Sequence, residues 1–317
     1  MNILVTGGAG FIGSNIVDEL IALGHNTTVI DNLSTGCREY VNKKANFYKI
    51  NINSPEVEKI LQQENINYVI HHAAQIDVQK SLTDPVFDAR NNIIGTINLL
   101  KSSVQAGVKK VVYASSAALY GQPDYLPLDE KHPVKAMSPY GISKHTPEHY
   151  LKMFKEIYDL DYTILRYSNV YGPRQDPTGE GGVVSIFVDR MLNGQAPIIY
   201  GDGEQTRDFI YVGDIVSANI AALSNGNGEL VNISCNTRNS VNEIKKIIND
   251  ILDSKLKPIY KDERDGDIKH SVMDNSKSKK ILNWQPEYDL NKGLRKTIKY
   301  YLKNKEMEEF TVTLEDE

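Results

Sequence analysis

The chain begins with a glycine-rich turn between an apolar strand and a helix, Thr6-Gly-Gly-Ala-Gly-Phe-Ile-Gly13. Three spaced glycines are weak evidence by themselves. Here they are a more specific signal for dinucleotide binding, because residues 3–6 are apolar or β-branched and a helical pattern follows the turn. Gly7 permits the tight turn, Gly10 lets phosphate groups approach the backbone, and Gly13 lets the helix pack closely on the strand. The free N–H groups at the start of the helix add a site for anions. The motif predicts a dinucleotide-binding βαβ unit.

The acidic residue at the end of the next strand indicates which dinucleotide is bound. Asp31 lies about 20 residues after the glycine turn, where a carboxylate accepts the hydroxyl groups of an adenosine ribose and repels a 2′-phosphate. NAD is therefore favoured over NADP.

Apolar strands alternate with helical segments through the first half of the chain. The expected strands are 3–6, 27–30, 68–71, 110–114 and 162–166, and the expected helices are 12–23, 55–64, 87–106 and 139–158. This alternation predicts an α/β fold, a Rossmann-type doubly wound parallel sheet with helices on both faces. Loops rich in Gly and Pro at 171–182 and 201–203 are typical of substrate-binding segments.

A smaller C-terminal α/β lobe is expected to bind the substrate. The predicted domains are an NAD-binding Rossmann domain, 1–168 with a returning segment at about 208–236, and a substrate-binding lobe, about 169–207 and 237–317. Ser240 and Glu243 have the spacing of a capping box and mark a helix start in this lobe. Residues 305–317 are acidic with little periodicity and are expected to be a frayed tail.

Ser116, Tyr140 and Lys144 predict the chemistry. The Tyr-x-x-x-Lys spacing alone says little, because the chain has 18 tyrosines and repeats that spacing at Tyr288 and elsewhere. Tyr140 and Lys144, however, share one face of an expected helix. Ser116 follows a buried strand, and in a doubly wound sheet ligands bind at the carboxyl ends of the strands. A tyrosine base beside a lysine cation can remove a hydroxyl proton while a nicotinamide accepts a hydride.

The composition excludes several classes of protein. The 317 residues are 40% hydrophobic and 24% charged with a formal net charge of −5, and no long block of Lys and Arg occurs, so neither a nucleic-acid partner nor a membrane is expected. Only two cysteines are present, Cys37 and Cys235, and the first strand begins at once with no leader pattern before it. The expected compartment is the cytoplasm.

One motif could indicate a metal site. His145-Thr-Pro-Glu-His149 matches the His-x-x-Glu-His pattern of one class of zinc protease. The stretch continues the helix of Tyr140 and includes Pro147, which is costly inside a helix, and no third ligand stands out. No metal is predicted, and His71-His72 is interpreted as buried packing near the cofactor.

Further motifs resemble those of the extended short-chain dehydrogenase/reductase family and, within it, of the UDP-glucose 4-epimerases. The resemblance covers nearly the whole chain. The matching segments are His72-Ala-Ala-Gln75, Asn92-Ile-Ile-Gly-Thr-Ile-Asn98, Leu165-Arg-Tyr-Ser-Asn-Val-Tyr-Gly-Pro-Arg174, Tyr200-Gly-Asp-Gly-Glu-Gln-Thr-Arg-Asp-Phe209 and Arg264-Asp-Gly-Asp267. Three departures from the family pattern are Asn51 in place of an adenine-contacting Asp, Ser168 in place of a frequent Phe, and Pro147 in a normally smooth helix.

The resemblance implies two sets of binding residues. The NAD site would be lined by Gly7, Gly10, Phe11, Ile12, Gly13, Asp31, Asn32, Ser34, Ile52, Ala73, Gln75, Asn92, Tyr140, Lys144 and Tyr167. The UDP-sugar would be held by Ser116, Tyr140, Asn169, Val183, Arg207, Arg264, Asp267 and Ser271, with the arginines on the diphosphate.

The implied reaction is inversion at C4 of a UDP-hexose through a transient 4-keto sugar. Tyr140 would act as the base, Ser116 would bind the sugar oxygen, and Lys144 would hold the nicotinamide ribose and lower the pKa of Tyr140. Ala117-Ala118 stands where related dehydratases carry an Asp-Glu pair and decarboxylases a Glu, which disfavours both. A UDP-glucuronate 4-epimerase, another nucleotide-sugar enzyme of the family, and a non-catalytic NAD-sensing module stay open as alternatives.

The resemblance also bears on the sugar and on assembly. Ser271 matches a position whose bulk limits the substituent at C2, so its small side chain predicts that N-acetylated UDP-hexoses, UDP-GlcNAc and UDP-GalNAc, are accepted beside UDP-glucose and UDP-galactose. A homodimer would form through helices near 90–106 and 141–157, although Pro147 weakens that expectation.

Overall fold

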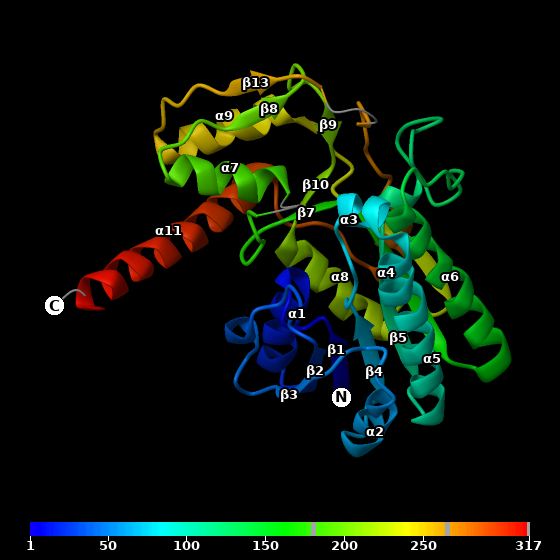
Figure 1. Ribbon diagram of the computed structural model, residues 1–317. Coiled ribbons are helices and arrows are strands. Elements are labelled where there is room, and N and C mark those ends of the chain that lie inside the picture. The colour runs from blue at the N-terminus through cyan, green and yellow to red at the C-terminus, as the bar shows by residue number, and fades with distance from the viewer. Residues whose placement is uncertain (179–181, 264–266, 316–317) are drawn as a thin grey trace.

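A seven-stranded parallel sheet organises the protein (Figure 1). The computed structural model describes residues 1–178, 182–263 and 267–315. The order across the sheet is β11-β6-β5-β4-β1-β2-β3. The bounds are β1 (Asn2–Thr6), β2 (Asn26–Asp31), β3 (Asn46–Lys49), β4 (Tyr68–His71), β5 (Lys110–Ser116), β6 (Asp161–Tyr167) and β11 (Glu229–Ile233). The predicted doubly wound sheet is confirmed, and its five expected strands all lie in it.

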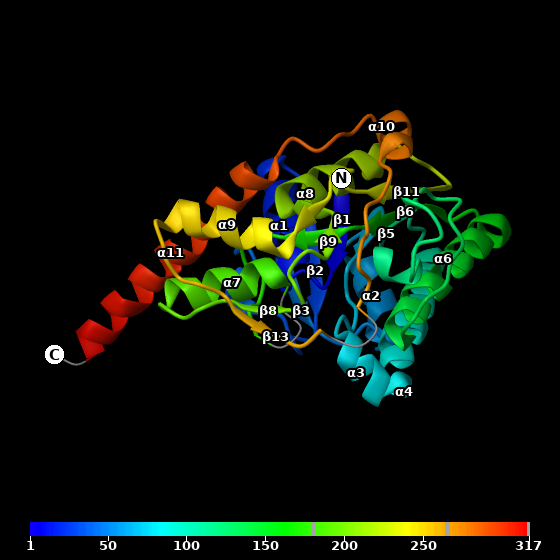
Figure 2. The same cartoon turned by 90° about the horizontal axis from the view of Figure 1, so that it is seen from above.

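Helices cover both faces of this sheet, as Figure 2 shows from above. On one face, α1 (Phe11–Ala22) and α8 (Val212–Ser224) pack against the strands, while α2 (Glu56–Gln63), α5 (Gly95–Gln105) and α6 (Pro139–Tyr158) cover the other. Because the strands are buried on both faces, they read as continuous apolar runs without alternation.

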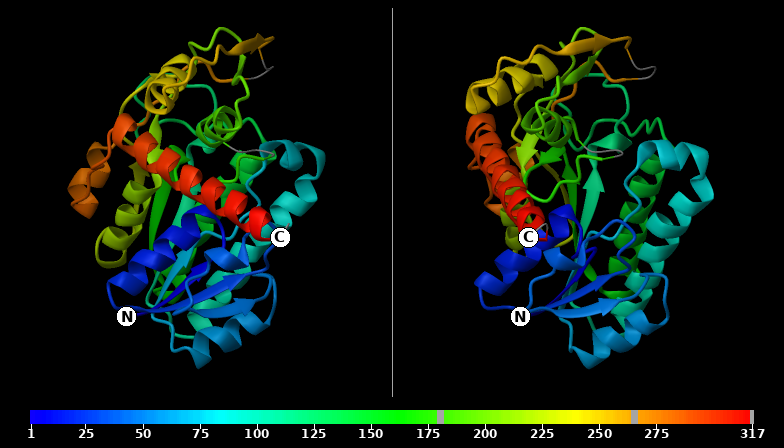
Figure 3. Two further views of the ribbon diagram at one scale, coloured as in Figure 1. Left: turned by 90° about the vertical axis from the view of Figure 1, so that its left-hand side faces the viewer. Right: turned by 60° about the vertical axis from the view of Figure 1, so that its left-hand side comes forward.

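A smaller group of elements lies beyond the carboxyl ends of the strands (Figure 3). Its core joins α7 (Val183–Leu192), α9 (Val241–Leu252) and the start of α11 (Leu290–Glu315). Short strands connect it: β7 (Asn169–Tyr171) with β10 (Phe209–Tyr211), β8 (Ile198–Tyr200) with β13 (Ile259–Lys261), and β9 (Thr206–Arg207) with β12 (Asn239–Ser240). The capping box predicted at Ser240 and Glu243 is confirmed by two reciprocal hydrogen bonds of 3.1 and 2.7 Å. The domain boundaries stay a prediction.

Three details differ from the expectations. The helix expected at 87–106 is composite, with α4 (Pro85–Ala89), a π-helical turn η2 (Arg90–Ile94) and α5 in succession. Helix α6 runs unbroken through Pro147, so the expected disturbance is wrong; the helix loses one backbone hydrogen bond there and continues. The expectation that residues 305–317 form a frayed tail is also wrong as far as Glu315, because α11 extends to that residue. Among the described residues, no helix is long and apolar enough to cross a bilayer.

Candidate active site

In the glycine turn between β1 and α1, close backbone contacts leave no room for a side chain at Gly7 or Gly13. Gly7 has a φ of +68°, and a Cβ there would lie 2.7 Å from the backbone nitrogen of Ala73. At Gly13 a Cβ would collide with the carbonyl group of Gly7. At Gly10 a Cβ would meet only the oxygen of Gly7, at 3.3 Å, and would otherwise face open space. Helix α1 begins there without a side-chain cap, so its first N–H groups point into that space.

Asp31 lies at the end of β2 beside this turn with its carboxylate held in place. Its Oδ2 accepts the N–H of Ala9 at 3.0 Å and its Oδ1 accepts the N–H of Leu33 at 2.8 Å. Each carboxylate oxygen keeps a further lone pair for a ligand hydroxyl. In the loop that follows, Asn32 Oδ1 accepts the N–H of Ser34 at 3.0 Å. The open cradle at Gly10 and the oriented carboxylate fit an NAD pyrophosphate and ribose.

Ser116, Tyr140 and Lys144 meet at the carboxyl end of β5. Ser116 ends that strand, and its Oγ caps the short helix η3 (Ala117–Leu119) by accepting the N–H of Ala118 at 3.2 Å. Tyr140 lies in the first turn of α6, with its hydroxyl close enough to Ser116 for that side chain to lower the pKa of Tyr140. Lys144 lies one turn later, 5% exposed, with its Nζ 4.7 Å from the centre of the Tyr113 ring. The structure therefore brings together the three residues that the sequence singled out.

Burial shifts the pKa values of Tyr140 and Lys144 so that both side chains favour their uncharged forms, which opposes the phenolate and the ammonium that the predicted chemistry needs. Burial raises the pKa of Tyr140; the hydrogen bond from Ser116 lowers it, and the charge of Asp88 raises it further. Burial lowers the pKa of Lys144 to about 8, while Glu148 and Asp88 act in the opposite direction. Ser116 is thus the side chain that favours the phenolate here, a role that the sequence assigned to Lys144.

Asn92 and Gln75 form a second cluster on the helix side of the site. Asn92 lies in the π-helical turn and donates to Ser143 Oγ at 2.9 Å, to the Gln75 carbonyl at 2.9 Å and to Asp88 Oδ1 at 3.1 Å. A π-helical turn often occurs at a functional site. Sequence reasoning missed Asp88, whose only sequence signal is an acidic residue one helical turn before Asn92.

Tyr167, at the end of β6, contacts His72 and Asn219, and Asn219 is a residue that sequence reasoning missed. Asn219 on α8 donates to the Tyr167 hydroxyl at 2.7 Å, and the His72 ring stacks on the Tyr167 ring with centroids 5.8 Å apart. Burial lowers the pKa of His72 to about 4, so its imidazole is neutral at physiological pH. His72 thus packs against a predicted NAD residue.

The expected UDP-sugar residues lie on the connections to the smaller lobe. Arg207 on β9 forms an ion pair with Asp267. Ser271 lies next to that strand, because its N–H donates to the Thr206 carbonyl at 3.1 Å. Asn169 begins β7 and Val183 begins α7, and within the described part of the chain no hydrogen bond or ion pair joins either to Arg207. Arg264 lies outside the described residues.

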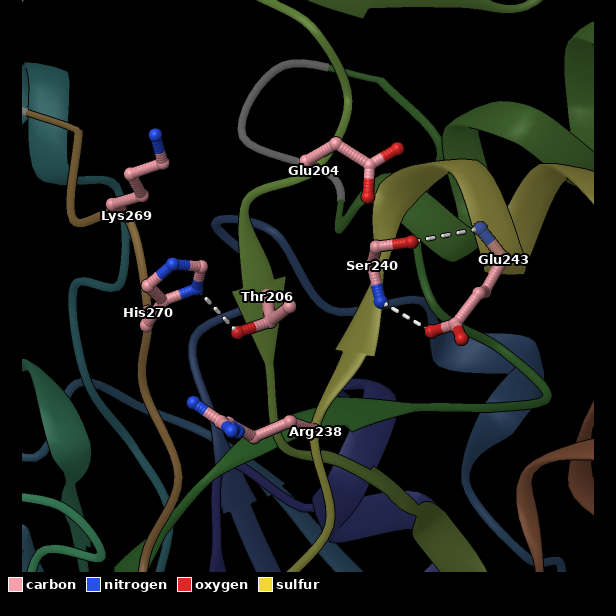
Figure 4. Close-up of a pocket in the computed structure, with 7 residues that line it drawn as sticks. All are labelled: Glu204, Thr206, Arg238, Ser240, Glu243, Lys269 and His270. Carbon is pink, nitrogen blue, oxygen red and sulfur yellow. Dashed lines mark hydrogen bonds between the residues drawn. The ribbon is translucent and has the colours of Figure 1, made fainter.

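Two polar cavities flank these connections. The smaller, about 160 Å³, is lined by Tyr200, Gly201, Asp202, Gln205, Glu263, Asp267, Ile268 and Lys269. The larger, about 490 Å³, is lined by Glu204, Thr206, Arg238, Ser240, Glu243, Lys269 and His270. In Figure 4, Lys269 and His270 lie across this cavity from Glu243, and His270 contacts Thr206 at 2.9 Å. Tyr200, which begins one of the matching segments but received no role from the sequence, lines the smaller cavity together with Asp267.

The remaining predicted residues lie along the same edge of the sheet. Phe11 and Ile12 begin α1, Ala73 follows β4, and Ile52 follows β3 and contacts the backbone at Gly95. Asn51, the departure at the adenine position, accepts the N–H of Asn53 at 2.8 Å and so forms a local turn.

The His-x-x-Glu-His segment lies on α6, and its glutamate points into the protein. Arg166 binds the buried Glu148 with two hydrogen bonds, of 3.0 and 2.6 Å. His149 is exposed, and the two histidine rings pack edge to face with centroids 4.7 Å apart. Within the described ranges, no group of three or more His, Cys, Asp or Glu side chains is arranged to hold a metal ion.

The chain is similar to known proteins over almost its whole length. Residues 3–234 match the model of the NAD-dependent epimerase/dehydratase family. A UDP-glucose 4-epimerase of Mycolicibacterium smegmatis is 39% identical over 95% of this chain and 98% of its own length. A UDP-glucuronate 4-epimerase of Thermodesulfobacterium geofontis is 35% identical over 96% of this chain and 97% of its own.

Solved structures agree closely with this fold. A UDP-glucose 4-epimerase of Thermotoga maritima with UDP-glucose has a TM-score of 0.94 at 45% identity, covering 96% of this chain and 99% of that one. A UDP-N-acetylglucosamine 4-epimerase of Methanobrevibacter ruminantium, in complex with UDP-N-acetylmuramic acid, scores 0.92 at 40% identity, covering 96% and 98%. A Thermus thermophilus UDP-glucose 4-epimerase in complex with NAD scores 0.89 at 38% identity, covering 95% and 99%.

Proposed function

This chain belongs to the NAD-dependent epimerase/dehydratase family, and from that premise we propose that it is a UDP-hexose 4-epimerase whose base is Tyr140. The observation that carries the assignment of the base is the meeting of Ser116, Tyr140 and Lys144 at the carboxyl end of β5, in the same parallel sheet as the glycine turn. The enzyme class itself follows from relatives that are UDP-glucose 4-epimerases over nearly the full length of the chain.

The side chains at the site divide the chemistry among them. When bound, NAD supplies the acceptor and donor of the hydride at C4, together with a positive charge. Tyr140 takes the proton of the 4-hydroxyl group and later returns it, so the sugar passes through a 4-ketone with no other acid or base required. Ser116 donates to the sugar oxygen or to the phenolate, and Lys144 places a cation near both.

The residues around Arg207 hold the nucleotide in this proposal. The Arg207–Asp267 ion pair keeps the guanidinium in place, and a guanidinium can bind a diphosphate through two parallel hydrogen bonds. Tyr200 lines the adjoining cavity together with Asp267. Asn169, Val183 and Ser271 complete the expected sugar-binding set.

The direct test is incubation of the purified protein, without added cofactor, with UDP-glucose and separately with UDP-N-acetylglucosamine. Anomeric proton signals followed by NMR should show conversion to the galacto epimers. If neither sugar changes after NAD is added, UDP-glucuronate becomes the next substrate to test, consistent with the relative of that activity. Failure with all three sugars would leave a non-catalytic NAD-binding role.

Ser271 is proposed to admit the N-acetyl group. Ser271→Tyr adds bulk beside Arg207, so we expect turnover of UDP-N-acetylglucosamine to fall by about tenfold or more relative to UDP-glucose, because a steric misfit in a pocket is worth about 1–3 kcal/mol. Competition between the two sugars, measured as the ratio of kcat/KM, checks this. Ser271→Ala is the matched control and should keep the ratio. Equal loss on both sugars in Ser271→Tyr would contradict the role.

A homodimer and a cytoplasmic location complete the proposal. Figure 1 shows α5 and α6 side by side on the outside of the sheet, and apolar side chains are exposed there: Ile94 (54%), Ile142 (55%) and Ile157 (61%). A second copy of the chain would cover them. Ile157→Lys should shift sedimentation to the monomer, whereas Ile259→Lys, on β13, should not; an unchanged dimer in Ile157→Lys would contradict this interface.

The free thiols Cys37 and Cys235 suit a reducing compartment.

A further inference from the structure

A buried carboxylate beside the catalytic pair forms no ion pair with any cation that the structure describes. Asp88, on α4, is 1% exposed. Its Oδ1 accepts hydrogen bonds from Gln75 at 2.9 Å and Asn92 at 3.1 Å, and its Oδ2 has no hydrogen-bond partner among the described residues. No ion pair found in the described part of the chain includes Asp88. Because an unpaired buried charge is costly, a carboxylate held in this way calls for a functional reason.

The second carboxylate facing Lys144 is neutralised. Glu148 lies one turn after Lys144 on α6, and Arg166 binds both of its oxygens while Ser115 donates to one of them at 2.6 Å. Two carboxylates therefore act on Lys144, and only Asp88 carries an uncompensated negative charge.

The other groups that face the pair are neutral. His71 ends β4 and is buried, His72 follows it and is half-buried, and desolvation lowers the pKa of both below the usual histidine value. Tyr113, from β5, is buried under Lys144 Nζ, and burial raises its pKa. The position of Asp88 relative to α6 is set by Asn92, which bridges Asp88 to Ser143, the residue before Lys144.

We propose that Asp88 is a positioning residue that supplies the counter-charge of the Tyr140–Lys144 pair. A negative charge favours the protonated form of both neighbours, so Asp88 keeps Lys144 cationic and opposes ionisation of Tyr140 until substrate and cofactor are bound. The charge of Asp88 raises the pKa of both groups, in agreement with this geometry. This inference rests on the proposed function, in which Tyr140 is the base.

Asp88→Asn removes the charge and keeps the shape. The amide oxygen can still accept from Gln75 and Asn92, so the cluster is expected to persist. Activity requires ionised Tyr140 and protonated Lys144, and both apparent pKa values should fall when the negative charge is lost. We therefore expect both limbs of the kcat/KM profile to move toward acid by about one pH unit, the shift that a nearby charge produces.

Asp84→Asn is the matched control. Asp84 lies one turn earlier, where it caps α4 by accepting the N–H of Phe87 at 2.9 Å, and Asn caps a helix equally well. The control loses the same charge, and its profile should not move. Lower activity in Asp88→Asn with both limbs in place would overturn the proposal, because a purely structural role would give that result.

A second readout does not depend on turnover. The ultraviolet absorbance of tyrosinate is titrated in Asp88→Asn and in the same variant carrying Tyr140→Phe, and the difference reports Tyr140 alone. Tyr140 should ionise at lower pH in Asp88→Asn than in the wild-type protein, and an unmoved titration would overturn the proposal. Absence of epimerase activity in the wild-type protein would instead refute the proposed function, while this titration would still test Asp88.

Discussion

Tyr140→Phe should lower kcat by about 10² to 10⁴, the contribution of a positioned proton-transfer group, with little change in unfolding temperature or NAD content. The substitution deletes one hydroxyl, which lies beside Ser116. The ring stays in the first turn of α6, where it packs as before. Initial rates by NMR, together with the NAD released on denaturation, measure both parts of the expectation.

A decoy in the same chain provides the control. Tyr288 and Lys292 have the same spacing, and Lys292 Nζ lies 4.4 Å from the centre of the Tyr288 ring. Tyr288 packs in the core of the smaller lobe, away from β5, so Tyr288→Phe should leave kcat unchanged. Full activity in Tyr140→Phe would remove this tyrosine from the base role.

Arg166→Met should cost about 3–5 kcal/mol of unfolding free energy, the largest stability effect we expect of a single substitution here. The side chains of Arg166 and Glu148 are 5% and 1% exposed. Removing the guanidinium leaves a buried carboxylate without its cation and takes a donor from the Tyr120 hydroxyl, which it reaches at 2.9 Å. Urea denaturation followed by circular dichroism measures the loss.

Two further variants identify the cause of that loss. Lys155→Met breaks an exposed ion pair with Asp159 at the end of α6, the helix that carries Glu148. Solvent screening limits the loss of unfolding free energy there to less than about 1 kcal/mol. Glu148→Gln combined with Arg166→Met removes both buried charges and should recover part of the stability. A cost for Arg166→Met no greater than for Lys155→Met would show that the buried pair contributes little.

Local sequence features predicted most of the sheet, although β3 and β11 were not among the expected strands. Strand and helix periods predicted five of the strands and the main helices, since burial on one or both faces dictates which residues are apolar. The π-helical turn at Asn92 was not predictable, because it continues a helix of ordinary composition. Pro147 was misjudged, because the tertiary packing of α6 outweighs one missing hydrogen bond.

The sequence by itself determined the class of this protein. Gly7, Gly13 and Asp31 act within one βαβ unit, so their meaning can be read from short spacings, and the Tyr140–Lys144 pair lies within one helical turn. Only the tertiary structure decided which charges are compensated. Glu148 meets Arg166 from another element, whereas the side-chain hydrogen bonds that the described residues donate to the Asp88 carboxylate come from amide groups. The free energy of a buried charge depends on neighbours that are distant in the chain, so no local pattern could have shown the difference between these two carboxylates.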